Sequence, residues 1–204
     1  MSRRRNNNSE ISNALNKVVL SYIQGQHKYI NEFIEQYKSA TDLLSLNIYP
    51  NAKEITESYA AFNCARTKIR HPFSDPTYTV VCVGDGRTPR TAALFAFRSN
   101  WRCISIDPIL DTAKIPMWIS KIRHLECIPK RVEDVDLMFE KVLIVCVHSH
   151  APLDRILEHI RGKVRSLIAI PCCVSYEYDR SPCKEYFDAG IWSPMNLVKY
   201  WKVI

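Results

Sequence analysis

The chain has 204 residues, of which 24% are charged and 47% hydrophobic, and its formal net charge is +7. This length is enough to bury a full core, and it favours one domain with an extension over two complete domains. No segment approaches the roughly 18 apolar residues that a membrane-spanning helix needs, so no membrane partner is expected. The basic charge is typical of proteins that bind a polyanion such as RNA, although a merely basic surface would give the same composition.

The eight cysteines and the N-terminal segment indicate the cellular compartment of the protein. Several cysteines lie inside apolar runs with the spacing of core residues, which predicts buried thiols rather than a disulfide framework. The polar segment SRRRNNNSE is followed by no apolar stretch, so no secretory signal is predicted. Together these features predict a reducing, cytoplasmic location, or a viral factory if the protein is viral. Cys172, Cys173 and Cys183 lack a second properly spaced pair, so no metal site is predicted.

The N-terminal part of the chain is predicted to be a disordered tail followed by a helical extension. Residues 1–9 are basic and rich in asparagine, and their arginine run either contacts nucleic acid or is simply solvated. Over residues 10–75, apolar side chains recur every three or four positions, which predicts amphipathic helices. The second of these helices is expected over 51–70 and ends before the dipeptide His71–Pro72.

Residues 76–204 are predicted to form a Rossmann-like α/β domain. Short runs rich in valine and isoleucine alternate there with helical patterns, as in a mostly parallel, doubly wound sheet. Few polar residues interrupt these runs, which is typical of strands covered by helices on both faces. The predicted strands are 79–84, 101–107, 125–132, 141–148, 166–171 and 197–204. The predicted helices between them are 88–98, 112–123, 133–140 and 152–162.

The first strand ends in the turn Gly84-Asp85-Gly86, at the edge of the sheet where such folds bind ligands. Glycines there let the backbone turn sharply and approach a ligand closely. Pro89 replaces the third glycine of the dinucleotide fingerprint and is expected at the first helical position, behind a Thr88 N-cap. Proline removes a donor that a pyrophosphate would use. The turn therefore favours an adenosyl ligand without phosphate, such as S-adenosylmethionine, over a dinucleotide.

Acidic residues after the second and third strands fit an adenosyl ligand. Asp107 ends the second strand, where a carboxylate can accept both ribose hydroxyls, although the same residue would also serve NAD. Glu133 follows the third strand, where an acidic side chain can meet the adenine amino group. The alternative is that Glu133 or Asp134 caps the next helix.

From about Tyr78 to Pro171 the sequence resembles the class I S-adenosylmethionine-dependent methyltransferases. Three features carry the resemblance: the turn Gly84-Asp85-Gly86, Asp107 after strand two, and the polar patch after strand four. The resemblance implies cofactor binding by Gly84, Asp85, Gly86 and Asp107, with the Asp85 side chain near the methionine end. We add Arg87, Thr88, Glu133 and His148 to the predicted cofactor site. The short segment after strand five leaves the family's usual seventh strand absent or supplied by another part of the chain.

Three residues are predicted to be catalytic. His148, in the run VCVHSHAP, could act as a base or donor at the end of strand four, or the run could be a polar loop that caps the next helix. Pro171-Cys172-Cys173 after strand five resembles a subgroup that includes tRNA 2′-O-methyltransferases; Cys172 is the catalytic candidate, and a buried, inert cysteine pair is the alternative. Lys68 could polarise a ribose hydroxyl or face a phosphate; the alternative is that it belongs to a solvated helix end favoured by the helix dipole.

The sequence therefore predicts an S-adenosylmethionine-dependent methyltransferase that acts on RNA. In one alternative, the chain keeps the methyltransferase fold as a catalytically inactive binding or structural protein. In a second, it is an NAD(P)-dependent oxidoreductase, which Pro89 disfavours. The sequence does not indicate an oligomeric state.

Overall fold

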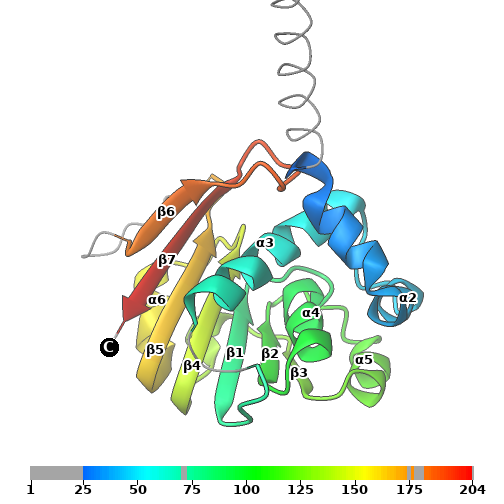
Figure 1. The fold of residues 1–204 in the computed structure, drawn as a ribbon. Helices are drawn as coiled ribbons and strands as arrows, with labels where there is room; N and C mark the ends of the chain where they lie inside the picture. Colours follow the sequence, from blue (N-terminus) through cyan, green and yellow to red (C-terminus); the bar gives the residue numbers. More distant parts are fainter. Residues whose placement is uncertain (1–24, 70–72, 174–175, 177–181, 204) are drawn as a thin grey trace, which may run out of the picture.

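The structure is a computed structural model that describes residues 25–69, 73–173, 176 and 182–203. The predicted tail, the first part of the helical extension and the dipeptide His71–Pro72 lie outside the described residues. At the centre is a seven-stranded sheet in the order β3-β2-β1-β4-β5-β7-β6 (Figure 1). The strands are β1 Tyr78–Val83, β2 Arg102–Ile106, β3 Leu125–Ile128, β4 Leu137–Val147, β5 Ile160–Ile170, β6 Lys184–Phe187 and β7 Leu197–Val203.

The pairing of the strands confirms the prediction of a Rossmann-like, mostly parallel sheet. Strands β1 to β5 pair in parallel, and β7 runs antiparallel to both β5 and β6. Val81 of β1 lies between Ile104 of β2 and Ile144 of β4, and all three side chains are buried. The strand order reverses between β1 and β4, so the carboxyl ends of these two strands form the switch point where ligands bind in doubly wound folds.

Helices cover the two faces of the sheet unequally (Figure 1). One face carries α3, α4 and α5, and the other carries α6 with the short helix η1. Residues 25–35 are also helical. The remaining helices are α2 Tyr37–Ser45, α3 Ala52–Lys68, α4 Arg90–Arg98, α5 Ile115–Lys121, η1 Val132–Asp134 and α6 Leu153–His159. Within the described part of the chain, no helix has both the length and the apolar character needed to cross a membrane.

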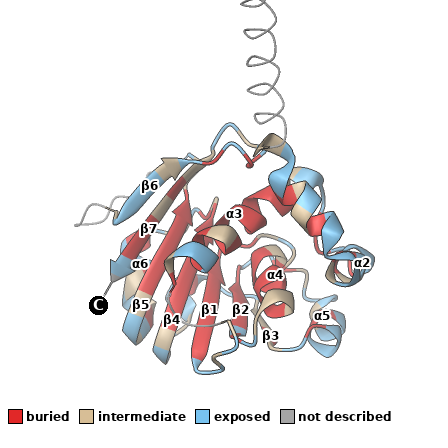
Figure 2. Ribbon diagram, in the orientation of Figure 1, coloured by how far each residue is buried: buried red, intermediate tan, exposed pale blue. Residues whose placement is uncertain are grey.

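The described part of the helical extension shares its core with the sheet. Phe33 packs edge-on against Tyr59 of α3, and both belong to the same buried cluster as Phe95 of α4. Much of α3 and α4 is buried (Figure 2). Buried Asp188, near the C-terminus, accepts a hydrogen bond of 2.5 Å from the Tyr29 hydroxyl and pairs with Lys28 at 2.6 Å. The extension therefore packs on α3 and on the segment before β7, and α3 itself packs on the face of the sheet formed by β4, β5 and β7.

Three predicted elements differ from the structure. The helix predicted over 133–140 is wrong, because β4 already begins at Leu137, with half-buried and exposed side chains alternating as in a strand. Strand β5 likewise begins at Ile160, within the segment 152–162 that was predicted to be helical. The edge strand β6 was not predicted, because Lys184–Phe187 is short and mostly exposed. It completes the seven strands that the sequence left in doubt.

Candidate functional site

A pocket of about 490 Å³ opens at the carboxyl ends of the parallel strands. Four turns line it: Gly84 and Gly86 after β1, Asp107–Ile109 after β2, Lys130–Glu133 after β3, and His148–Pro152 after β4. Arg90 of α4 closes one side. The pocket thus lies at the topological switch point, where ligands of doubly wound sheets bind.

The glycine turn after β1 is shaped by a close contact with the turn after β4. Gly84 and Gly86 both have left-handed backbones, with φ of +81° and +84°. A Cβ atom at Gly84 would lie 2.6 Å from the Ser149 Cβ, so no side chain fits there. A Cβ at Gly86 would have space, since its nearest neighbour is 3.5 Å away on Arg90. Both glycines line the pocket.

Asp85 points into the protein and does not line the pocket. Its carboxylate accepts hydrogen bonds from the backbone N–H groups of Thr91 and Ala92, each at 3.1 Å, and from the Ser105 hydroxyl at 3.0 Å. Burial raises the pKa of Asp85 above its usual range, against the opposing effects of Arg90 and these backbone groups. The structure therefore places Asp85 as the cap of helix α4 rather than beside the methionine end of a cofactor.

The start of α4 is fully hydrogen-bonded within the chain. Besides the two N–H groups that Asp85 takes, Arg90 donates to the Thr88 carbonyl and Ala93 to the Pro89 carbonyl. Thr88, predicted to be the N-cap, instead donates its hydroxyl to the Ile48 carbonyl at 2.6 Å, and Pro89 occupies the N-cap position. Free N–H groups at a helix start are what holds a pyrophosphate in dinucleotide-binding folds. Here the protein uses all of them itself.

Asp107 is held in an orientation that suits a ribose. Its side chain lines the pocket, Oδ2 accepts from the Gly86 N–H at 2.8 Å, and Oδ1 accepts from the Ile109 N–H at 2.9 Å. Each carboxylate oxygen can accept a further hydrogen bond. Glu133, in η1, is exposed at the pocket mouth and makes no capping contact, since Arg131 is the N-cap of η1 and no side chain caps it. Arg87 is exposed and lies outside the pocket lining.

His148 and Glu57 form a buried polar pair beside the pocket. His148 has a left-handed backbone with φ of 52°, and its ring contacts the backbone of Met195 through a hydrogen bond. Its Nε2 lies 3.7 Å from Oε1 of Glu57, a fully buried residue of α3 that also pairs with Lys53 at 2.8 Å. Burial lowers the pKa of His148, and Glu57 partly opposes this effect. His148 therefore favours the neutral imidazole.

Two atoms of this pair make no hydrogen bond with the described residues: Nε2 of His148 and Oε2 of Glu57. An unsatisfied buried polar atom costs roughly 1–3 kcal/mol, so folded proteins keep few of them. Of the two residues only His148 lines the pocket, and the fully buried Glu57 lies behind it. The sequence analysis missed Glu57; the signal that could have found it is a charged residue inside the buried run Ile55–Ala65 of α3.

The two remaining catalytic candidates lie in different places. Cys172 is half-buried after β5, where its Sγ lies 3.8 Å from the His148 carbonyl oxygen, and Cys173 is exposed, so the two cysteines are not a buried pair. Lys68 lies at the opposite edge of the sheet, in a separate hollow of about 450 Å³ with Tyr78 and Ser166. The structure thus brings His148 and Cys172 to one edge of the sheet and separates Lys68 from them.

No protein-family model matches the chain, and no curated protein matches it in sequence. Among solved structures it is similar to a mutant of MtNAS in complex with S-adenosylmethionine, with 16% identity over 96% of this chain and 80% of that chain and a TM-score of 0.52. A 1,6-didemethyltoxoflavin-N1-methyltransferase from Burkholderia thailandensis, with bound 1,6-didemethyltoxoflavin and S-adenosylhomocysteine, has 15% identity over 87% of this chain and 73% of that chain. Its TM-score of 0.36 is too low to support an argument. The first similarity shows the Rossmann-like fold.

Proposed function

We propose that the chain is an S-adenosylmethionine-dependent methyltransferase whose cofactor binds in the pocket at the switch point. One contrast carries this proposal: the pocket presents the Asp107 carboxylate for a ribose, while Asp85 and the chain itself take every N–H group at the start of α4. A dinucleotide needs both features, whereas an adenosyl ligand without phosphate needs only the first. The same contrast disfavours an NAD(P)-dependent oxidoreductase.

The lining residues fit the parts of S-adenosylmethionine in order along the pocket. Asp107 would hold the ribose hydroxyls, and Glu133 with the exposed apolar side chain of Ile109 would contact the adenine. Arg90 and His148, at the β1 and β4 end of the pocket, would face the amino-acid group. When bound, the cofactor supplies a methyl group that is already activated, so positioning of the acceptor does most of the catalytic work.

We place the methyl acceptor beside His148 and Cys172, and we propose RNA as its class. His148 lines the pocket and would orient the acceptor group, and the buried Glu57 behind it would hold the imidazole in place. Lys130 and Arg131 are exposed and line the pocket, where they could contact phosphates, and Arg87 is exposed next to the lining residue Gly86. The net charge of +7 supports the same partner.

A thermal-shift comparison of S-adenosylmethionine, S-adenosylhomocysteine, NAD and NADP tests the cofactor. A ligand at about a hundredfold over its dissociation constant adds roughly 2.7 kcal/mol of stability. We expect this shift with the two adenosyl ligands, and we expect Asp107→Ala to abolish it. Asp111→Ala is the matched control, because the Asp111 carboxylate pairs with Lys114 and lies outside the pocket lining. A shift with NAD alone would overturn the proposal.

Transfer of a labelled methyl group tests the acceptor. We expect label in bulk RNA, and less of it as salt concentration rises, because phosphate contacts weaken in salt. Label in small molecules alone would support the methyltransferase activity and contradict RNA as the acceptor. Cofactor binding without transfer to RNA, DNA, protein or small molecules would favour the inactive binding protein.

A further inference from the structure

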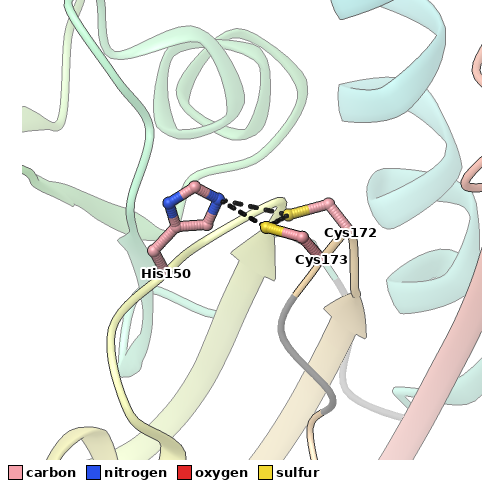
Figure 3. A group of neighbouring side chains, drawn as sticks. All are labelled: His150, Cys172 and Cys173. Atoms are coloured by element: carbon pink, nitrogen blue, oxygen red, sulfur yellow. Dashed lines mark hydrogen bonds between the residues drawn. The ribbon is translucent and has the colours of Figure 1, made fainter.

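Three metal-binding side chains meet at the rim of the pocket, from two loops that are distant in sequence. His150 follows β4, and Cys172 and Cys173 follow β5 (Figure 3). Nε2 of His150 lies 3.3 Å from each of the two sulfur atoms, and the sulfur atoms are 3.6 Å apart. Strands β4 and β5 pair in parallel along their length, which brings the residues after their carboxyl ends together.

The dimensions of this triangle fit a tetrahedral zinc ion. Bonds of about 2.3 Å to sulfur and 2.0–2.1 Å to nitrogen place two sulfur ligands about 3.8 Å apart and a sulfur and a nitrogen about 3.6 Å apart. The observed distances of 3.6 Å and 3.3 Å agree within a few tenths of an ångström. The three donor atoms therefore form a compact group, in which all lie within 4.8 Å of one another.

We propose that His150, Cys172 and Cys173 bind a Zn²⁺ ion. Two thiolates and an imidazole are a donor set that favours zinc over hard cations such as magnesium or calcium. His150 and Cys173 are exposed and Cys172 is half-buried, so the fourth position of the tetrahedron is open to solvent. A site with three protein ligands and one open position resembles catalytic rather than closed structural zinc sites.

The site has consequences for two residues of the pocket rim. His150 also lines the cofactor pocket, so the ion would hold the loop after β4 to the loop after β5 beside the methyl acceptor. Cys172 would serve as a ligand rather than as a nucleophile. The sequence did not predict this site because the third ligand comes from another strand, at no recognisable spacing from the cysteine pair.

Zinc content of the full chain, reconstituted under reducing conditions and freed of loose metal, tests the proposal. We expect one zinc per chain in the wild type, and loss of that zinc in Cys173→Ser and in His150→Ala. Cys183→Ser is the matched control, because Cys183 is another exposed thiol that lies outside the cluster. Equal zinc content in the wild type and both ligand variants would overturn the proposal, as would a wild-type chain that takes up no zinc.

Two further readouts separate metal binding from a folding defect. Cobalt in place of zinc should give thiolate-to-metal absorption in the wild type and in Cys183→Ser, with none in Cys173→Ser. Zinc should raise the melting temperature of the first two proteins and leave that of Cys173→Ser unchanged. A Cys173→Ser chain that is folded by circular dichroism and still binds cobalt with the wild-type spectrum would contradict the assignment. None of these measurements needs S-adenosylmethionine, so the zinc site and the proposed function can fail separately.

Discussion

The two halves of the pocket satisfy their polar groups in different ways. In the half built by β1 and β2, Asp85 and Asp107 together accept five hydrogen bonds from the chain, three and two respectively. In the second half, built by β4 with α3 beside it, Nε2 of His148 and Oε2 of Glu57 make no hydrogen bond with the described residues. Most polar atoms of the first half are thus satisfied by the fold, although Nε of Arg90 also lacks a partner within the described part of the chain. In the second half each of the two residues has a contact within the fold but keeps one atom that no described residue satisfies.

This difference separates stability from activity. A polar group that the fold satisfies stabilises the chain, and its removal should be measured as a loss of folding free energy. A buried polar group without a partner destabilises the chain, and proteins retain such groups mainly where they act on a ligand. Substitutions in the β1–β2 half should therefore lower stability, and those in the β4–α3 half should lower turnover with little effect on stability.

The largest expected effect is at Gly84, where the two halves touch. In Gly84→Ala the new Cβ would lie 2.6 Å from that of Ser149, and the left-handed backbone would be strained as well. Overpacking and a left-handed non-glycine backbone each cost roughly 1–3 kcal/mol, so we expect a loss of about 2–5 kcal/mol in the free energy of unfolding.

Gly86→Ala is the matched control for Gly84→Ala, measured in the same denaturant titration. Its φ of +84° is nearly the same, but the added Cβ has space. We expect a loss of only about 1–2 kcal/mol, from backbone strain alone. Equal losses in the two variants would show that the contact between the halves contributes nothing.

The second effect concerns Glu57, which tests the β4–α3 half. Glu57→Gln keeps the size of the side chain and removes the charge behind the pocket. Its ion-pair partner Lys53 is 40% exposed and can remain solvated, so we expect the free energy of unfolding to change by less than about 1 kcal/mol. Loss of a positioning group should lower the turnover number about ten- to a hundredfold in the methyl-transfer assay.

Glu126→Gln is the control for the Glu57 variant. Glu126 is a paired carboxylate on β3, bonded to Arg102 at 2.5 Å and outside the pocket lining. We expect it to change neither stability nor turnover appreciably. If Glu57→Gln instead unfolds the chain and leaves the turnover of the folded fraction intact, Glu57 is structural and the two halves do not differ as described.

The parts of this site that the sequence predicted are those set by short-range pattern. The apolar runs indicated β1, β2 and most of β4, because strands buried on both faces need continuous valine and isoleucine. The pattern also pointed to three residues that line the pocket, because each comes just after such a run: Gly84, Gly86 and Asp107. Residues just after a buried strand are therefore the most predictable part of the site.

The parts that the sequence did not predict depend on distant packing or on side-chain direction. Glu57 comes within 3.7 Å of His148 only because α3 packs on the face of the sheet formed by β4, β5 and β7, which no spacing near the turn reveals. The Asp85 side chain turns inward because helix α4 offers it two N–H groups, an arrangement that competes with ligand contact. β6 lacked a pattern altogether, since Lys184–Phe187 is a mostly exposed edge strand.

The smallest effect, and the one that tests the β1–β2 half most directly, is at Ser105. Its buried hydroxyl donates to Oδ2 of Asp85, and burial raises the pKa of that carboxyl from its usual 3.8. When folding raises the pKa of an acid, the free energy of unfolding is highest below the pKa of the unfolded state. It then falls as the pH rises from the unfolded-state pKa through the folded-state pKa. The Ser105 hydrogen bond offsets part of that loss, because it favours the ionised form. In Ser105→Ala we therefore expect a loss of about 1 kcal/mol at pH values above the raised folded pKa, and this loss should shrink as the pH falls through that pKa.

Unfolding titrations of Ser105→Ala at a series of pH values measure this dependence. Ser120→Ala is the control, because the exposed Ser120 hydroxyl donates to the Met117 carbonyl of its own helix, an acceptor that does not titrate. Its effect on stability should be small and the same at every pH. A Ser105→Ala loss that is equally independent of pH would mean that the hydroxyl does not stabilise the ionised carboxylate. The cap of α4 would then rest on the hydrogen bonds from Thr91 and Ala92, and the β1–β2 half would be less fully organised by folding than its geometry indicates.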